Sequence, residues 1–177
     1  MKVILISGKA QNGKDTTASI LKQTLVDNGD RVLITHYADL LKYICTNYFG
    51  WDGKKDDKGR QILQYVGTDV IRKQNPTLWV EFVAMILKYF KGNWDYVIIP
   101  DCRFPNEITR LRDEGFDTTH LRVVRSGFES PLTEEQQNHP SETALDNFEA
   151  DFVIDNNGSL EELEFKIDYL VEEYLYA

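Results

Sequence analysis

A glycine-rich segment near the N-terminus constrains the fold of this chain more than any other feature. Residues 8–16 read GKAQNGKDT and come just after the short apolar run of residues 3–6. Glycines five positions apart, followed at once by Lys14, suit a loop that wraps a polyphosphate, because glycine lets the backbone turn tightly and present its N–H groups. The lysine then reaches the terminal phosphates. The segment predicts a loop that binds a nucleoside triphosphate, and the alternative is an ordinary glycine-rich turn.

The same segment departs from the usual pattern at one position. The common form is G-x-x-x-x-G-K-[ST], whereas here Asp15 stands in the hydroxyl position and Thr16 follows it. A carboxylate beside a triphosphate is unfavourable unless Mg²⁺ or the loop lysine offsets its charge. We therefore predict that Asp15 orders Mg²⁺, directly or through water. The alternative is that Asp15 stabilises the N-terminus of the following helix and Thr16 binds the metal.

The order of apolar runs and helical patterns predicts an α/β fold with a largely parallel sheet. Strands are expected at residues 3–6, 31–36, 96–99, 120–125 and 152–154. Helices are expected at residues 16–27, from 39 onward, and at 60–73, 78–91, 106–114 and 160–174. Residues 126–142 are polar and contain a glycine and two prolines. A loop of this length in a compact domain is often a lid or a binding loop.

Composition narrows the possible partners. A chain of 177 residues fits one domain with a real core. Its net charge of −9 argues against general affinity for nucleic acid polymers or anionic membranes, and no run approaches the ~20 apolar residues of a membrane span. The N-terminus lacks signal-peptide features, and Cys45 and Cys102 form no C-x-x-C motif, so we expect reduced thiols and a cytoplasmic protein.

Polar residues follow the most apolar of the expected strands, residues 96–99. Ligands bind at this edge of a parallel sheet. Asp101 comes directly after this strand and could hold Mg²⁺, with a helix-capping or turn aspartate as the alternative. Two residues later, the fork of Arg103 suits bidentate binding of a phosphate. A surface ion pair between Arg103 and Glu107 is the alternative.

Two further groups of residues carry charge or hydrogen-bonding capacity. Arg60, Gln64 and Thr68 are four residues apart and share one helix face, although such spacing alone favours a solvated face. Arg122 and Arg125 flank the start of the polar segment 126–142. Positive charge beside a lid suits phosphoryl transfer, because the transition state gathers negative charge on the transferred group.

Taken with their context, these motifs make the chain resemble the deoxynucleoside monophosphate kinases of tailed bacteriophages, within the P-loop nucleoside monophosphate kinase family. The matching segments are SGKxxxGKDT at 7–16, YAD at 37–39 with Lys42, GRxxLQxxGTD at 59–69 with Arg72 and Trp79, DxRFPNE at 101–107, HPSE at 139–142 and IDNNGSLEEL at 154–163. They span nearly the whole chain in order. In that family Asp15 is part of the G-K-D-T pattern.

The resemblance implies a three-layer α/β fold of the P-loop NTPase type, with a mostly parallel five-stranded sheet, helices on both faces and a lid. It implies a single kinase domain over residues 1–177. Within it, residues 39–92 would form the monophosphate-binding helical region and residues 126–142 the lid.

The resemblance also implies roles for individual residues. The residues expected to bind ATP are Gly8, Gly13, Lys14, Asp15 and Thr16 at the phosphates, and Asn156 and Gly158 at the adenine. The residues expected to serve Mg²⁺ are Asp15, Thr16 and Asp101. The acceptor nucleotide would be held by Asp39, Lys42, Arg60, Gln64, Arg72 and Arg103. The residues expected to act in catalysis are Lys14, Asp15, Asp101, Arg103 and Arg125.

The implied reaction is ATP + dNMP → ADP + dNDP. Its acceptor is a phosphate oxygen that is already anionic, so positioning and charge neutralisation should suffice. One alternative keeps the fold but changes the acceptor to phosphomevalonate or dephospho-coenzyme A. Another is a nucleotide-dependent switch, which would not need a second anion site. The sequence leaves open which bases are accepted, which sugar is preferred, and whether the protein is a homodimer or has another oligomeric state. Trp51, Trp79 or Tyr65 could stack on a base or simply pack.

Overall fold

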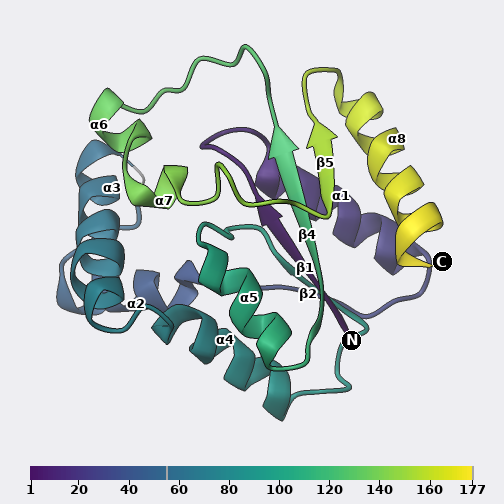
Figure 1. Cartoon of the computed structure of the whole chain (residues 1–177), viewed down its shortest axis with the longest axis horizontal. Helices are drawn as coiled ribbons and strands as arrows, with labels where there is room; N and C mark the ends of the chain where they lie inside the picture. The colour runs from purple at the N-terminus through teal and green to yellow at the C-terminus, as the bar shows by residue number, and fades with distance from the viewer. Residues whose placement is uncertain (55, 177) are drawn as a thin grey trace.

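The core of the fold is one parallel sheet, seen in a computed structural model that describes residues 1–54 and 56–176 (Figure 1). Its strands are β1 (Lys2–Ser7), β2 (Val32–Ile34), β3 (Tyr96–Ile99), β4 (Asp117–Val124) and β5 (Phe152–Asp155). They lie in the order β2-β3-β1-β4-β5, and each neighbouring pair is parallel. The predicted α/β fold with five parallel strands is confirmed.

Helices connect these strands and cover both faces of the sheet (Figure 1). They are α1 (Lys14–Asp27), α2 (Ala38–Tyr48), α3 (Asp57–Gln64), the π-helix η1 (Tyr65–Arg72), α4 (Leu78–Tyr89), α5 (Pro105–Asp113), the short α6 (Glu134–Gln137) and α7 (Pro140–Thr143), α8 (Leu160–Leu170) and the π-helical turn η2 (Val171–Leu175). The expected helix at 60–73 is therefore α3 continued by η1. The segment 126–142, expected to be a loop, contains α6 and the start of α7.

Strand β1 shows how the apolar pattern builds the layers. Successive side chains of a strand point to opposite faces, and every residue from Val3 to Ile6 is fully buried. Ile4 and Ile6 pack in the cluster formed with α1 and α8, whereas Val3 and Leu5 pack in the cluster formed with α4 and α5. A strand that is apolar at consecutive positions thus lies between two helical layers.

The strand order brings two loops together at one edge of the sheet. β1 and β3 are neighbours with Leu5 opposite Ile99, so the loop that leaves β1 and the loop that leaves β3 start side by side. The first is residues 8–16, called here the phosphate loop, and the second carries Asp101 and Arg103. The site is built at this edge, as expected for parallel sheets.

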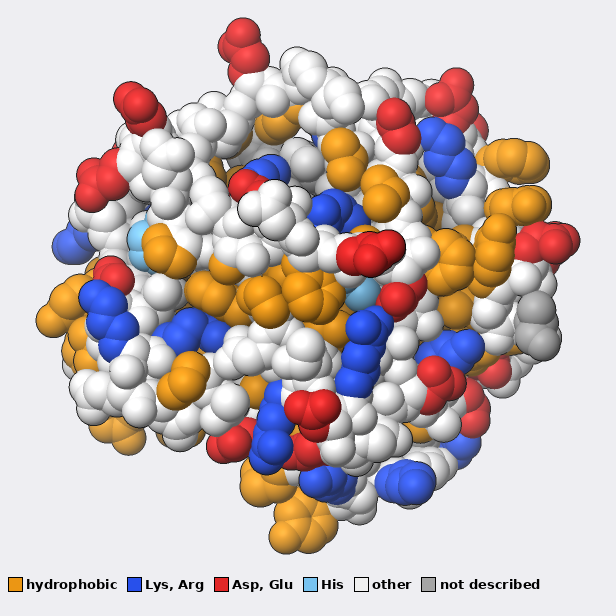
Figure 2. Space-filling model, viewed as in Figure 1, with side chains coloured by type: hydrophobic (Ala, Val, Ile, Leu, Met, Phe, Trp, Pro, Cys, Tyr) orange, Lys and Arg blue, Asp and Glu red, His pale blue; other side chains and the backbone are white. Residues whose placement is uncertain are grey.

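The surface has a mixed character. On the face shown in Figure 2, a band of hydrophobic side chains crosses the middle, and acidic and basic side chains are interspersed around it. In the part of the chain that the structure describes, no helix combines the length and the apolar character that a membrane crossing requires.

Candidate active site

Both glycines of the phosphate loop lie where a side chain does not fit. Gly8 has a φ of +149°, and a Cβ there would lie 2.4 Å from the carbonyl oxygen of Val123. Gly13 has a φ of +97°, and a Cβ there would lie 2.3 Å from the side-chain nitrogen of Asn156. That nitrogen donates a 2.9 Å hydrogen bond to the carbonyl oxygen of Asn12. The glycines therefore allow the loop to pack closely against β4 and the turn after β5.

Lys14 begins α1 at the mouth of the loop. Its ammonium donates 2.8 Å hydrogen bonds to the carbonyl oxygens of Gly8 and Lys9. Burial and the nearby Arg103 guanidinium lower the pKa of Lys14 from 10.5 to about 8. The first-turn N–H groups of a helix lack partners within the helix, so the loop offers backbone donors and a lysine to an anion at one place.

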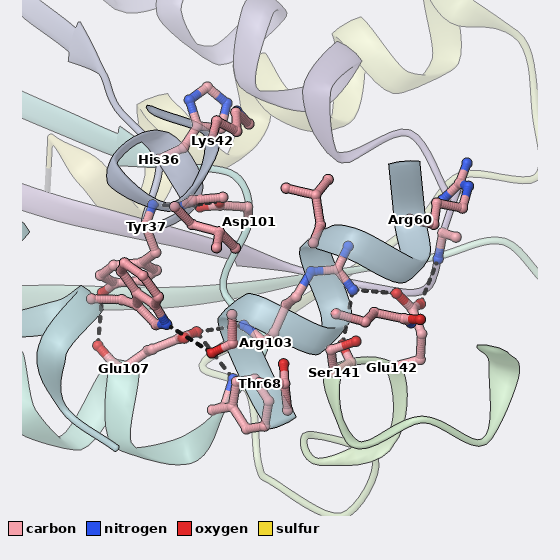
Figure 3. Close-up of a pocket in the computed structure, with 18 of the residues that line it drawn as sticks. His36, Tyr37, Lys42, Arg60, Thr68, Asp101, Arg103, Glu107, Ser141 and Glu142 are labelled. Carbon is pink, nitrogen blue, oxygen red and sulfur yellow. Dashed lines mark hydrogen bonds and ion pairs between the residues drawn. The ribbon is translucent and has the colours of Figure 1, made fainter. Parts of the chain in front are cut away.

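A cavity of about 540 Å³ opens in front of this loop, bounded by α2, α3, η1 and the loop after β3 (Figure 3). It is lined by many of the residues singled out from the sequence, namely Lys14, Asp15, Lys42, Arg60, Gln64, Arg72, Asp101 and Arg103. The expected donor loop and several residues of the expected acceptor site thus face one space.

The two carboxylates expected to serve a metal differ in their surroundings. Asp101 accepts hydrogen bonds from the backbone N–H groups of Tyr37 (2.9 Å) and Ala38 (3.0 Å), one to each oxygen, and so holds the start of α2. The capping role that the sequence left open is therefore present. Asp15 is exposed in the first turn of α1 and lines the cavity. Thr16 is also exposed but is not among the residues that line the cavity.

The Arg103 guanidinium does not pair with Glu107, the alternative partner that the sequence left open. Its Nη1 donates to the carbonyl oxygen of Ser141 at 2.8 Å and pairs with the carboxylate of Glu142. Glu107 instead accepts the backbone N–H of Arg103 at 2.7 Å. The suggested surface ion pair between Arg103 and Glu107 is therefore wrong, since the guanidinium reaches across to α7 from the loop after β3.

Glu107 is the centre of a second polar network. Its carboxylate accepts backbone N–H groups of Arg103 and Phe104 and pairs with Arg72, which also donates to the side-chain oxygen of Asn106 at 2.9 Å. The Arg72 guanidinium lies 3.7 Å from the centroid of the Phe104 ring. Burial raises the pKa of Glu107 to about 7, against the opposing effects of Arg72 and the backbone N–H groups. This network fixes η1 relative to β3.

The other residues expected to bind the acceptor nucleotide do not all face the cavity. Arg60, Gln64 and Lys42 line the cavity. Asp39 is not among the lining residues; it accepts from the backbone N–H of His36 at 3.0 Å and lies 3.3 Å from the Lys42 ammonium. Asp39 thus positions the entry to α2 and its lysine.

The three aromatic candidates for base stacking are separated by the fold. Trp79 lines the cavity, and its indole N–H donates to the carbonyl oxygen of Gly67 at 3.2 Å. Trp51 is buried in a different cluster, with Cys45 and Val66. Tyr65 is exposed and is not among the lining residues. Of these three residues, only Trp79 lines the cavity where it could contact a ligand.

Some expected site residues lie outside this cavity. Arg125 is exposed, and its guanidinium lies 4.8 Å from the centroid of the Phe128 ring. Asn156 braces the phosphate loop, and Gly158 packs against Glu162. The structure therefore does not bring these three residues to the cavity wall. Arg122, the other arginine flanking the lid, instead donates to the carbonyl oxygens of Leu145 and Phe148.

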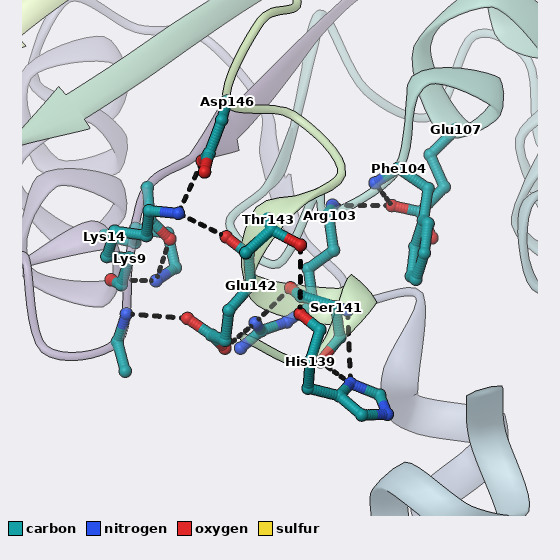
Figure 4. A network of polar contacts seen from close by, with 12 residues as sticks. Lys9, Lys14, Arg103, Phe104, Glu107, His139, Ser141, Glu142, Thr143 and Asp146 are labelled. Carbon is teal, nitrogen blue, oxygen red and sulfur yellow. Dashed lines mark hydrogen bonds and ion pairs between the residues drawn. The ribbon is translucent and has the colours of Figure 1, made fainter. Parts of the chain in front are cut away.

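Residues 139–146 lie over the phosphate loop (Figure 4). Lys9 donates to the carbonyl oxygen of Glu142 at 2.7 Å and pairs with Asp146 at 2.5 Å. The backbone N–H of Ala10 donates to the carboxylate of Glu142 at 3.1 Å. The HPSE motif at 139–142 was visible in the sequence, but nothing in it indicates contact with residues more than 100 positions earlier.

A family model for deoxynucleotide monophosphate kinases matches residues 51–167. The chain belongs to the deoxynucleotide monophosphate kinase family. The match covers α3, η1, the loop after β3 and the segment 139–146, but it begins after the phosphate loop.

Two relatives in this deoxynucleotide monophosphate kinase family carry that name. The protein of Escherichia phage RB69 is 36% identical over 114 residues, which is 63% of this chain and 44% of the relative. The protein of Enterobacteria phage T4 is 37% identical over 110 residues, which is 61% of this chain and 43% of the relative. The chain thus matches less than half the length of each.

A solved structure supports the fold. The Mycobacterium tuberculosis APS kinase CysC, in complex with AMPPNP and APS, superposes with a TM-score of 0.54 at 11% identity and covers 97% of this chain and 98% of its own. At that identity the likeness concerns the fold alone, which is that of a P-loop kinase.

Proposed function

We propose that the chain is a deoxynucleoside monophosphate kinase that transfers the γ-phosphate of ATP to a dNMP, giving ADP and dNDP. The observation that carries the proposal is that Lys14 of the phosphate loop and a group of arginines line one cavity. Two polyanions must approach within bonding distance, and cationic side chains on both sides offset their repulsion. Membership of the family supports the same reaction.

The donor side of the proposal rests on the phosphate loop. Gly8, Gly13, Lys14 and Thr16 would hold the phosphates of ATP. Asn156, which donates to the Asn12 carbonyl oxygen, and Gly158, two residues after it, would meet the adenine. The APS kinase neighbour was solved with AMPPNP, an ATP analogue, which favours ATP as the donor.

Magnesium is part of the proposal because oxygen ligands are present. The exposed carboxylate of Asp15 at the cavity wall suits a hard cation, with Thr16 and Asp101 as further candidates. When bound, Mg²⁺ would neutralise charge on the donor phosphates. Because both oxygens of Asp101 already accept backbone N–H groups, we favour Asp15 as the principal residue.

The acceptor side would use the region 39–92 and the loop after β3. Lys42, Arg60, Gln64, Arg72 and Arg103 would bind the monophosphate nucleotide, with Asp39 holding Lys42 in place. The acceptor oxygen is anionic at neutral pH, so the side chains need only orient it and exclude water. The lid, residues 126–142, would supply the exclusion of water, and its movement would be required for Arg125 to reach the transferred group.

Two alternatives are separated from this proposal by one experiment. A coupled assay of ADP release, run with each of the eight common ribo- and deoxynucleoside monophosphates, should show release that depends on a deoxynucleoside monophosphate. Release with phosphomevalonate or dephospho-coenzyme A instead would favour a kinase with another acceptor. Slow release that no acceptor stimulates would favour a nucleotide-dependent switch. Since the substrates of this reaction are cytoplasmic metabolites, we propose that the protein acts in the cytoplasm.

A further inference from the structure

Glu142 occupies an unusual place for a carboxylate. It lies between the phosphate loop and the loop after β3, where one oxygen accepts the Ala10 N–H at 3.1 Å and the other pairs with Arg103 (Figures 3 and 4). Its side chain is only 7% exposed, whereas that of Arg103 is 34% exposed. An acidic side chain thus points into the most cationic part of the site.

The donors that Glu142 uses are the donors that a phosphate would need. Ala10 belongs to the loop proposed to hold ATP, and Arg103 is proposed to contact the phosphate of the acceptor. Carboxylate and phosphate oxygens both accept from backbone N–H groups and from arginine. The N–H of Ala10 cannot make a full hydrogen bond to both, so a phosphate that takes this donor must displace the Glu142 carboxylate.

The segment that carries Glu142 also touches the other parts of the site. Lys9 donates to the carbonyl oxygen of Glu142, and Arg103 donates to the carbonyl oxygen of Ser141. At the start of α7, one ring nitrogen of His139 lies 4.0 Å from the carboxylate of Asp69 on η1. Displacement of Glu142 would therefore change contacts at the phosphate loop, at Arg103 and at η1.

Resting on the function proposed above, we propose that Glu142 is an internal counter-ion whose carboxylate competes with a nucleotide phosphate for the Ala10 N–H and for Arg103. Its carboxylate offsets the charges of Arg103, with which it pairs, and of the nearby Lys14 before the donor binds. When ATP enters, its terminal phosphate replaces the carboxylate at Ala10, and Arg103 is released for the transferred group. Because of this exchange, Arg103 is free to contact the transferred group only when the donor is bound. The competing carboxylate also weakens ATP binding relative to a site without it.

The test is equilibrium binding of AMPPNP with Mg²⁺ to Glu142→Gln and to the wild-type protein, measured by calorimetry. Glutamine keeps the size and the acceptor oxygen but removes the charge, so the dissociation constant should fall by about five- to tenfold, as expected for one like charge near the ligand. Without nucleotide, the melting temperature of Glu142→Gln should decrease, because Arg103 and Lys14 lose their counter-ion. The matched control is Glu135→Gln, an exposed carboxylate on α6 in the same segment, which should change neither value.

An unchanged or weaker affinity of Glu142→Gln for AMPPNP would overturn the proposal. If that variant does not fold, Glu142→Asp provides the test, because its shorter side chain retains the charge but withdraws it from the Ala10 N–H. Affinity should again increase, and an unchanged affinity would refute the exchange. A wild-type protein that transfers phosphate to a dNMP while both variants bind AMPPNP like wild type would refute this inference alone. A wild-type protein that binds no AMPPNP would refute the proposed function and the inference with it.

Discussion

Arg72 and Glu107 form an ion pair in the protein interior, with side chains only 10% and 4% exposed. Arg72 ends η1 and Glu107 lies in the first turn of α5, so the pair joins the proposed acceptor region to the loop that carries Arg103. Glu107 also accepts the backbone N–H groups of Arg103 and Phe104. One carboxylate therefore sets the position of two arginines that line the cavity.

Replacing Glu107 should be among the most destabilising changes in the site. Glu107→Ala leaves a buried guanidinium and two backbone N–H groups without their acceptor, which should lower the free energy of unfolding by about 3–5 kcal/mol. Urea denaturation checks this value. The control is Lys73→Ala, which removes an exposed pair with Asp69 on η1 and should have little effect. A loss below about 1 kcal/mol for Glu107→Ala would show that this pair contributes no more to stability than a surface ion pair.

The pKa of Lys14 gives ATP binding a pH dependence. Burial and Arg103 lower this pKa to about 8, and a bound triphosphate would favour the charged lysine. Affinity for AMPPNP should therefore fall as the pH rises from 7 to 9, by up to about tenfold per unit above the pKa. Binding titrations at several pH values measure it, and Lys14→Met should remove the dependence. A wild-type affinity that stays constant over this range would contradict the assignment of Lys14.

The same shift has a consequence for stability with the opposite sign. The folded pKa of about 8 lies below the ordinary value of 10.5, so the unfolded chain binds more protons between these two pH values. The cost of burying the charged lysine is present below pH 8 and disappears as the pH rises towards 10.5. Relative to Lys14→Met, the wild-type protein should thus gain stability over that range in thermal melts. A difference between the two proteins that does not vary with pH would show that Lys14 is not titrating there.

Arg103 should matter more for the acceptor than for the donor. It lies beyond β3, lines the cavity and is proposed to hold the acceptor phosphate, so Arg103→Ala should raise KM for the dNMP and lower kcat, with a smaller change in KM for ATP. Steady-state kinetics with each substrate varied in turn separates these effects. Equal increases in both KM values would identify a general electrostatic effect instead.

The roles of Asp15 and Thr16 in metal binding can be distinguished by the magnesium dependence of activity in variants of each residue. If Asp15 orders the metal, Asp15→Ala should shift the magnesium dependence of activity to higher concentration, whereas Thr16→Ala should shift it less. An anion in the first turn of α1 is otherwise worth about 0.3–1 kcal/mol to the helix. A variant Asp15→Ala with lower thermal stability and an unmoved magnesium curve would show that the residue serves the helix only.

Local patterns in the sequence were enough to predict the sheet and the phosphate loop. Consecutive apolar residues predict buried parallel strands, and the two glycines are required by close contacts with Val123 and Asn156. Strand β4 has eight residues and begins at Asp117, earlier than expected. Its first residues, Asp117 to Thr119, are not strongly apolar, so the sequence pattern did not indicate them as strand. Parallel pairing with β1 from Lys2 onward extends it nonetheless.

The contacts of the site were harder to predict, because they join residues far apart in sequence. The sequence favours a phosphate as the partner of the Arg103 guanidinium, with Glu107, four residues away, as the alternative. In the structure the guanidinium pairs with Glu142, 39 positions away. Asp101 appeared to be available for a metal, but its oxygens hold the start of α2. Local spacing identifies residues with suitable chemistry, whereas the fold decides which of their groups are already engaged.

The most direct test of the proposed function is to follow the labelled γ-phosphate of ATP in the presence of a single dNMP. The label should appear in dNDP in equal amount to ADP, and omission of the dNMP should stop the reaction. Lys14→Ala should slow it by about 10³-fold or more. Label that appears only as inorganic phosphate, at a rate independent of the dNMP, would contradict the proposed function.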